Sequence, residues 1–316
     1  MDPVATTNHP ALAGLTVLER GWLSSNNILI HAAPGEPGAV LVDTGHVVHR
    51  EQTLALVRHA LRGAPLARIV NTHLHSDHCG GNALLQQAFG APIAIPPGLA
   101  DAVRAWDLAR LSHDDFGQRE RFYIEGTIGP GESFVAGGRR WQALAAPGHD
   151  PHSIVLFDAG TGLLLSADAL WANGFGVVFP ELVGETGFGE VGATLDLIER
   201  LPVRLVVPGH GPPFADVAAA LARARSRLAA FRADPARHAR HAAKVLVKYH
   251  VMEEGRLPRS ELVRWSAAAP LMRQVWSRFG EGRGVAATLE AWVEGFVNEL
   301  AGSGAVAIEG ADVVDL

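Results

Sequence analysis

The chain has little cysteine, lysine or tyrosine: among its 316 residues are one cysteine (Cys79), two lysines (Lys244 and Lys248) and two tyrosines (Tyr123 and Tyr249). One cysteine excludes an internal disulfide and any metal site built on several thiolates. The apolar runs are shorter than the roughly 20 residues that a membrane-spanning helix needs, and no basic segment followed by an apolar stretch marks a signal peptide at the start. A net charge of −6 with only 19% charged residues disfavours both disorder and general nucleic-acid binding. We therefore expect a cytoplasmic, globular protein with no membrane partner.

Histidine, by contrast, is abundant, with 15 residues. Four side chains of metal-binding type stand within six residues, namely His73, His75, Asp77 and His78. In an extended loop, residues 73, 75 and 77 would point to one side, and a turn at Gly80-Gly81 would let His78 diverge from that row. Such an arrangement can serve two metal ions about 3.5–4 Å apart. Imidazole and carboxylate ligands suit zinc, with iron or manganese as alternatives.

The first two thirds of the chain alternates short β-branched runs with single helices, which predicts an α/β layered domain over residues 1–215. The expected strands are Val17–Leu18, Asn27–His31, Ala39–Asp43, Arg68–Thr72, Ala91–Ile95, Trp141–Ala146, Ser153–Asp158, Gly162–Ser166 and Arg204–Pro208. The expected helices are Glu51–Leu61, Gly80–Phe89 and Thr194–Arg200. Residues 216–316 form a second predicted domain, which is helical in period up to Trp265 and again over Gly284–Ala301. A hairpin predicted at 305–314 makes this module similar to a winged helix.

Further ligand-type residues stand at the ends of other predicted strands. His149, Asp168 and His210 each follow an apolar run, and Asp43 does so ahead of the histidine motif. Loops at one edge of a layer of strands are where catalytic groups collect. A lone His-x-His pair is most often a solvent-exposed turn, but these matching residues downstream favour a metal site.

The complete set resembles that of the metallo-β-lactamase-fold hydrolases. The resemblance covers roughly residues 15–215 and consists of the His-x-His-x-Asp-His motif at 73–78, then His149, Asp168 and His210, with Val42-Asp43-Thr44-Gly45 ahead of it. It implies a four-layer αββα sandwich whose site lies at the edge where the loops converge, followed by a mainly helical module.

The resemblance also implies a role for each residue. The first metal would be bound by His73, His75 and His149. The second would be bound by Asp77, His78 and His210, with Asp168 bridging the two. Asp43 would orient a ligand histidine from outside the ligand set. Asp77 would be the catalytic residue that orients the metal-bridging hydroxide and moves a proton.

The resemblance leaves several chemistries open. The aspartate at 168 is similar to that of glyoxalase II, related thioesterases, lactonases and RNA-processing members. Nothing after residue 215 alternates strands and helices as a flavodoxin-like redox domain does. We expect a glyoxalase II-like hydrolase of a small ester-like substrate, a thioester first. The alternatives are an endoribonuclease-like phosphodiesterase and a lactonase, which would use one of the two tyrosines, Tyr123 before Tyr249. The sequence does not indicate the oligomeric state.

Two features have two interpretations each. Residues 217–250 sum to +7, which indicates either a site for an anionic partner, such as a cofactor phosphate or an RNA backbone, or a solvated helix face. Trp171, Phe175 and Phe179 either line an apolar acyl pocket or pack their loops. The segment Ala105–Phe134 is expected over or beside the site. Cys79 and His152 are expected to have packing and surface roles.

Overall fold

The computed structural model describes residues 9–111 and 119–316. The chain groups into two compact units, and the division falls inside helix α9 (Val217–Ala233). The first unit contains the described residues up to Leu111, from 119 to Pro180 and from Thr186 to Ala229, whereas the second is chiefly Ala230–Leu316. The domain boundary expected after residue 215 stays a prediction, since compact units need not fold independently.

Two sheets form the centre of the first unit. In the six-stranded sheet, β1 to β3 are antiparallel neighbours and β3 to β6 are parallel. Its strands in order are β1 (Leu15–Leu18), β2 (Asn27–Ile30), β3 (Ala39–Val42), β4 (Leu66–Val70), β5 (Ile93–Ile95) and β6 (Gly126–Thr127). The five-stranded sheet is antiparallel from β7 to β10 and ends in a parallel pair. Its strands are β7 (Ser133–Ala136), β8 (Arg139–Ala145), β9 (Ile154–Asp158), β10 (Leu163–Ala167) and β11 (Leu205–Pro208).

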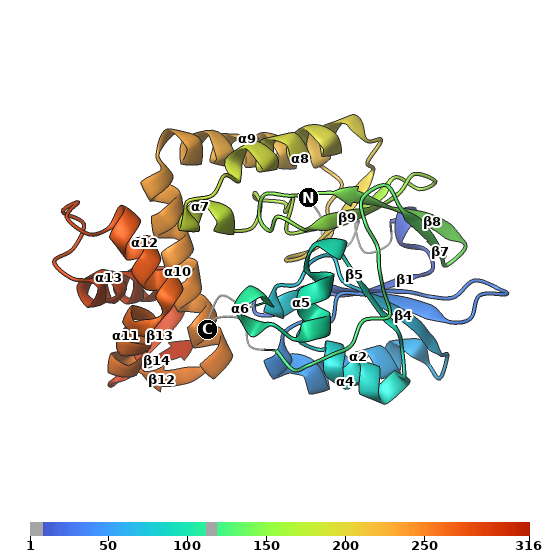
Figure 1. Ribbon diagram of the computed structural model, residues 1–316, viewed down its shortest axis with the longest axis horizontal. Helices are drawn as coiled ribbons and strands as arrows, with labels where there is room; N and C mark the ends of the chain where they lie inside the picture. The colour runs from blue at the N-terminus through green and yellow to red at the C-terminus, as the bar shows by residue number, and fades with distance from the viewer. Residues whose placement is uncertain (1–8, 112–118) are drawn as a thin grey trace. The chain divides into compact units, whose positions relative to one another are not determined.

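Alternation along the strands divides the apolar side chains between two cores. On β3, Val40 and Val42 pack between the sheets with Trp141 and Leu165 of the other sheet, whereas Leu41 packs on the opposite face. That outer face is covered by α2 (Arg50–Leu61), α4 (Asn82–Phe89) and α5 (Ala100–Ala105). Helices α8 (Phe188–Arg200) and α9 lie beyond the five-stranded sheet (Figure 1). The predicted four-layer αββα sandwich is confirmed.

The remaining helices of the first unit are short. They are α3 (Ser76–Cys79), α6 (Leu108–Leu111) and α7 (Phe179–Val183), the last of which ends in the second unit.

The second unit is mainly helical, as expected. Its helices are α10 (Pro235–Glu254), α11 (Arg259–Ala268), α12 (Pro270–Phe279) and α13 (Leu289–Gly302). The predicted hairpin is present as β13 (Val306–Glu309) and β14 (Asp312–Asp315), and β12 (Arg256–Pro258) pairs with β14 to complete a three-stranded antiparallel sheet. This order of helices and strands is consistent with a winged-helix-like module. Expecting helix without interruption to Trp265 was wrong, because β12 interrupts it.

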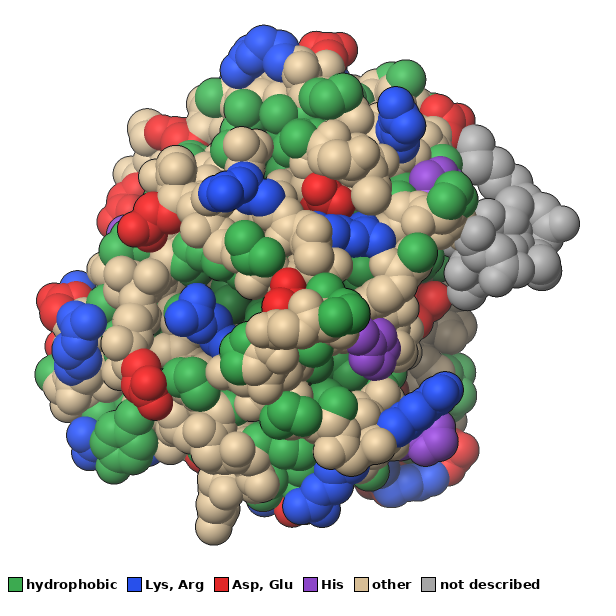
Figure 2. All heavy atoms as spheres, turned by 90° about the vertical axis from the view of Figure 1, so that its right-hand side faces the viewer, with side chains coloured by type: hydrophobic (Ala, Val, Ile, Leu, Met, Phe, Trp, Pro, Cys, Tyr) green, Lys and Arg blue, Asp and Glu red, His purple; other side chains and the backbone are tan. Residues whose placement is uncertain are grey.

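Charge is mixed on one face of the molecule. On the face drawn in Figure 2, Lys and Arg side chains are scattered among Asp and Glu side chains. Among the described residues, no helix is both long and apolar enough to cross a membrane.

Candidate metal centre

The predicted ligand residues stand after the carboxyl ends of strands that run in one direction within each sheet. His73 follows β4, which is parallel to β3. His149, Asp168 and His210 follow β8, β10 and β11, and these three strands also share a direction. Loops at such an edge converge because the strands that carry them end together.

Backbone hydrogen bonds join the loops at this edge, both within the six-stranded sheet and between the two sheets. Ser25 N–H donates to the Asp77 carbonyl at 2.9 Å, and Asn26 N–H donates to the Gly209 carbonyl at 2.7 Å. Ile154 N–H, at the start of β9, donates to the Thr72 carbonyl at 2.9 Å. The loops are therefore held by main-chain contacts that do not depend on a ligand.

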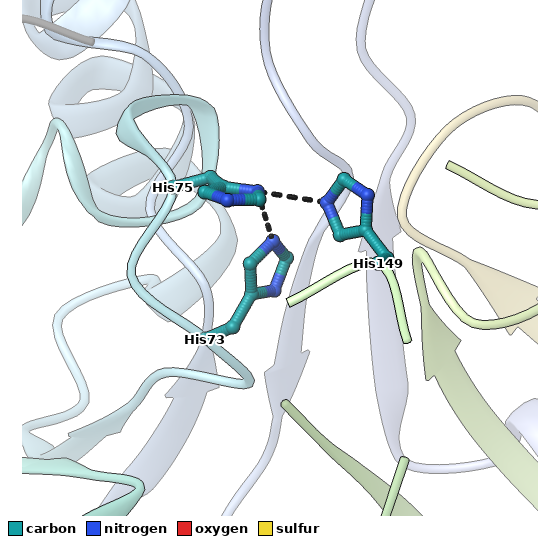
Figure 3. Close-up of side chains that lie close together, drawn as sticks. All are labelled: His73, His75 and His149. Atoms are coloured by element: carbon teal, nitrogen blue, oxygen red, sulfur yellow. Dashed lines mark hydrogen bonds between the residues drawn. The ribbon is translucent and has the colours of Figure 1, made fainter. Parts of the chain in front are cut away.

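The first group consists of three imidazoles, those of His73, His75 and His149, which point toward one another (Figure 3). His75 Nδ1 lies 3.1 Å from His73 Nε2 and 2.7 Å from His149 Nε2. His149 Nδ1–H donates to the Val177 carbonyl at 2.6 Å. Since a carbonyl only accepts, the proton of the neutral His149 ring is on Nδ1 and its Nε2 lone pair faces the other two rings.

The second group consists of Asp77, His78, Asp168 and His210. Asp77 Oδ2 accepts from His210 Nε2 at 3.1 Å. Residues 76–79 form the single turn α3, so Asp77 and His78 lie together on a helical turn. The expectation that Asp77 continues an extended row with His73 and His75 was wrong, because the chain begins to turn at Ser76, before the glycines.

Asp168 faces both groups. Its Oδ1 lies 3.4 Å from His78 Nε2, and its Oδ2 lies 3.4 Å from His149 Nε2. The side chain is buried, and the Trp171 indole Nε1–H donates to Oδ1 at 3.2 Å. The two groups therefore share one carboxylate.

Asp43 lies next to the second group and is a buried residue, 2% exposed. Its Oδ2 is 2.7 Å from His78 Nδ1 and accepts from Thr72 Oγ1 at the same distance, while Oδ1 accepts from Thr72 N–H at 2.8 Å. A carboxylate there keeps the His78 proton on Nδ1 and leaves Nε2 directed at Asp168.

The electrostatic environment differs between the groups. Burial lowers the pKa of the His73 imidazole well below its ordinary value, and the nearby His78 and His149 lower it further. Burial also acts to lower the pKa of His78, but the surrounding carboxylates, with Asp168 first, outweigh it and raise that pKa. Burial raises the pKa of Asp77, yet His78 and His210 outweigh it and leave that pKa below its usual range. At neutral pH the His73 imidazole is thus neutral, and the second group contains the ionised Asp77 carboxylate.

These donor atoms fit a pair of divalent cations. Three imidazole nitrogens meet at one point in the first group, where a single proton can serve only one of the two short N···N contacts. Nε2 of His78 is buried and makes no hydrogen bond, although Asp168 is 3.4 Å away. Burying unsatisfied nitrogens is costly unless a ligand completes them.

The other residues singled out from the sequence lie as follows. Cys79 is buried in the core over α2 and α4, where burial raises the pKa of its thiol, and His152 is exposed. Phe175 is buried, whereas half-buried Phe179 packs on His75 with ring centroids 4.9 Å apart. Part of the segment Ala105–Phe134 lies outside the described residues. From the rest, Arg119 donates to the Leu74 carbonyl at 2.5 Å, beside the motif.

Sequence reasoning missed three contributors to the site. Trp22 stacks on His210, with ring centroids 5.6 Å apart and planes 9° apart, yet is 61% exposed. Asp150 Oδ2 lies 3.9 Å from His75 Nε2. The Val177 carbonyl is a backbone group that carries no sequence signal. For Asp150, adjacency to His149 was a signal that could have been used.

The basic run of residues 217–250 is largely engaged in intramolecular contacts. Arg225 pairs with Asp196 and Glu199, and Arg223 donates to the Ala172 carbonyl. In the second unit, Arg240 and Lys244 pair with Glu299 and Lys248 pairs with Asp315.

The family model described as Metallo-beta-lactamase superfamily matches residues 20–210. Among curated proteins, the hydroxyacylglutathione hydrolase of Gloeobacter violaceus is 31% identical over 157 residues, which cover 50% of this chain and 54% of that protein. The type A flavoprotein of Rhodobacter capsulatus is 29% identical over 199 residues, covering 58% and 44%. The chain thus spans about half the length of these relatives.

Solved structures of the same fold cover nearly the whole chain. A beta-lactamase domain protein from Burkholderia ambifaria has a TM-score of 0.55 at 21% identity and covers 96% of this chain and 93% of its own. A metallo-beta-lactamase family protein from Thermus thermophilus has a TM-score of 0.53 at 20% identity, covering 97% and 100%. At these identities the likeness establishes the fold alone.

Proposed function

Since the chain belongs to the metallo-beta-lactamase superfamily, we propose that it is a dinuclear-metal hydrolase that acts on an ester-like carbonyl, a thioester first. The observation that carries the proposal is the shared carboxylate of Asp168, with one oxygen toward each group. Two-metal hydrolases hold their cations about 3.5–4 Å apart, a separation that one carboxylate can span with its two oxygens.

The two groups divide the donors between the proposed ions. The first ion would be held by His73, His75 and His149, the second by Asp77, His78 and His210, and Asp168 would contact both. Imidazole and carboxylate donors favour zinc, with iron or manganese as alternatives. When bound, two such ions lower the pKa of a water and polarise a carbonyl oxygen.

The protein's own residues would orient the reactants and move the proton. Asp77 Oδ2 is one of the donor atoms of the second group and lies 3.1 Å from His210 Nε2. In this position it would accept the proton of the attacking water and deliver it to the leaving group. Asp43 would keep His78 in one tautomer throughout, through its 2.7 Å contact with Nδ1.

Aromatic rings flank the site and favour a substrate with an apolar acyl part. Phe179 packs on His75 and His149 with ring centroids 4.9 and 5.6 Å away. On the other side, Trp171 and Trp22 pack on His210 at 5.4 and 5.6 Å. Rings at these positions exclude water from the carbonyl and offer apolar area to the acyl group.

The thioester proposal is supported by the hydroxyacylglutathione hydrolases among the relatives, because an acylglutathione is a thioester. RNA cleavage is less supported, since arginines and lysines of the basic run are engaged with carboxylates. Lactone opening through Tyr123 is also less supported. That residue is 65% exposed, and its backbone bonds to Gln86 of α4.

The test is a turnover panel on metal-loaded full chain with an acyl thioester, an N-acyl homoserine lactone and a single-stranded RNA. We expect the thioester to be hydrolysed fastest. His75→Ala should lower turnover by at least about 100-fold. Replacing a residue that only orients a metal ligand already lowers metal affinity or activity about 10–100-fold, and His75 is a proposed ligand itself. His152→Ala, at an exposed histidine outside both groups, is the matched control and should retain activity. Turnover of RNA alone would contradict the thioester proposal.

A further inference from the structure

A tight turn follows Asp168 directly. Trp171 N–H donates to the Gly174 carbonyl at 2.6 Å, and the two residues pair as an isolated antiparallel bridge. Gly174 has φ +128°, a conformation that side chains rarely adopt. Residues 171–174, the Trp171 turn, are therefore a defined structure rather than a loose loop.

The segment that contains this turn contacts both ligand groups. The segment is residues 168–177. Within it, the Trp171 indole N–H donates to Asp168 Oδ1 at 3.2 Å, and Gly176 N–H donates to the Asp168 carbonyl at 2.9 Å. At its end, the Val177 carbonyl accepts from His149 Nδ1 at 2.6 Å. This one short segment thus sets one ligand in each group, so a displacement of the turn would move both.

Two arginines of α9 fasten the Trp171 turn from outside. Arg223 Nε–H donates to the Ala172 carbonyl at 2.7 Å. The Arg227 guanidinium covers Gly174 so closely that a Cβ there would lie 2.6 Å from Nη1. An i, i+4 spacing puts both arginines on one face of the helix. Arg227 is half-buried, and burial lowers the pKa of its guanidinium.

Arg225, between them in sequence, points to a different neighbour. Its guanidinium pairs with Asp196 Oδ1 at 2.7 Å and Glu199 Oε2 at 2.8 Å, both on α8. On α9, Arg223 and Arg227 therefore contact the Trp171 turn, whereas Arg225 contacts only α8 among the interactions described and can serve as a control.

We propose that Arg223 and Arg227 are positioning residues of the metal centre, which fix the Trp171 turn so that the indole N–H holds Asp168 in its shared orientation. The inference rests on the proposed function in that Asp168 is taken to contact both ions. Outer partners that orient a ligand typically change metal affinity by 10–100-fold. Arg223 and Arg227, which belong to the basic run that suggested an anionic partner, would thus stabilise the metal centre instead.

The test measures zinc affinity of the full chain by competition with a chromophoric chelator, without substrate. Trp171→Phe, which removes only the indole N–H donor and part of the ring, should weaken binding about 10-fold or more. The double variant R223A/R227A should also weaken zinc binding, and R223K/R227A, which keeps a donor for the Ala172 carbonyl, should restore part of the loss. R225A should bind zinc as the wild type does.

A double-mutant cycle decides whether the arginines act through Trp171. If they do, the combined variant (R223A/R227A with Trp171→Phe) loses clearly less zinc affinity than the product of the two separate fold-losses. Fully multiplicative effects, an unchanged affinity in R223A/R227A, or an equal loss in R225A would each overturn the proposal. Because the readout is affinity, a wild type that binds zinc but hydrolyses no thioester would contradict the proposed substrate and leave this test intact.

Discussion

Replacing Asp43 by Asn tests how the second group is prepared for a cation. The Asp43 Oδ1 must go on accepting from Thr72 N–H at 2.8 Å, so the new NH2 comes to face His78 Nδ1, 2.7 Å from the present Oδ2. A donor there favours the tautomer in which His78 carries its proton on Nε2. That proton would point at Asp168, where the ligand lone pair is needed.

The size of the effect follows from these contacts. Loss of an orienting carboxylate typically weakens metal binding 10–100-fold, or about 1.4–2.7 kcal/mol. The Thr72 hydroxyl, which now donates to Asp43 at 2.7 Å, is left with the longer 3.2 Å contact to His73 Nδ1. Because a buried donor with no partner at all costs about 1–3 kcal/mol of unfolding free energy, this weaker contact should cost less than that. We therefore expect Asp43→Asn to fold, with reduced stability, and to bind its second zinc ion at least about 10-fold more weakly.

The assay is calorimetric titration of metal-free protein with zinc at pH 7, resolving two binding steps, beside urea unfolding. Asp158→Asn is the control, since Asp158 is equally buried but pairs with Arg139, outside both ligand groups. That variant should lose stability and keep both zinc affinities. Two wild-type affinities in Asp43→Asn would refute the reasoning about the His78 tautomer.

Three further predictions concern packing, protonation and metal. A Cβ at Gly209 would lie 2.2 Å from Asp168 Oδ1, so Gly209→Ala should weaken zinc binding. Gly189→Ala, on α8 with open space around it, should bind normally and gain up to about 1 kcal/mol in urea unfolding. Burial, aided by His241, lowers the pKa of His238 to about 4. As pH falls from about 6.5 to 4, the unfolded chain takes up a proton that the folded ring resists, so stability is lost by up to about 3 kcal/mol. Chelator-treated His238→Gln should lose correspondingly less than chelator-treated wild type in urea unfolding at pH 7, 5.5 and 4.5. Finally, zinc at 100 times its dissociation constant should raise the unfolding free energy of metal-free wild type by about 2.7 kcal/mol, and an unchanged melting temperature would argue against binding.

That these side chains lie together could be predicted because each belongs to a loop that follows an apolar run, and that run becomes a strand; their role as metal ligands stays a prediction. β4, β8, β10 and β11 were all expected within a few residues of their observed bounds. Alternation and β-branched residues are local signals, and the order of strands places their ends at one edge. The family resemblance then assigned roles that spacing alone does not.

Elements with weak local signals were missed. β12 is three residues long and exposed at both ends, and it exists because it pairs with β14, more than fifty residues later. α8 begins at Phe188, six residues before the helix expected at Thr194, since Gly189 and Gly192 weaken the helical pattern. Tertiary packing supplies what these segments lack in propensity.

The supporting contacts of the site were also beyond the sequence. The Val177 carbonyl and the Trp171 indole become orienting groups only when the chain folds back on His149 and Asp168. The sequence shows that α9 carries several arginines. Which of them contact the Trp171 turn and which contact α8 depends on the rotation of the helix about its axis and on the elements packed against it. Nonlocal contacts of this kind leave no periodic signature.

The most direct test of the central claim is the metal content of the full chain, purified, loaded with zinc, passed through a desalting column and measured by mass spectrometry of the metal. Two groups of donors that share Asp168 predict about two ions per chain, and about one or fewer in Asp168→Ala. One ion or none in the wild type, or two ions retained in Asp168→Ala, would contradict the dinuclear centre.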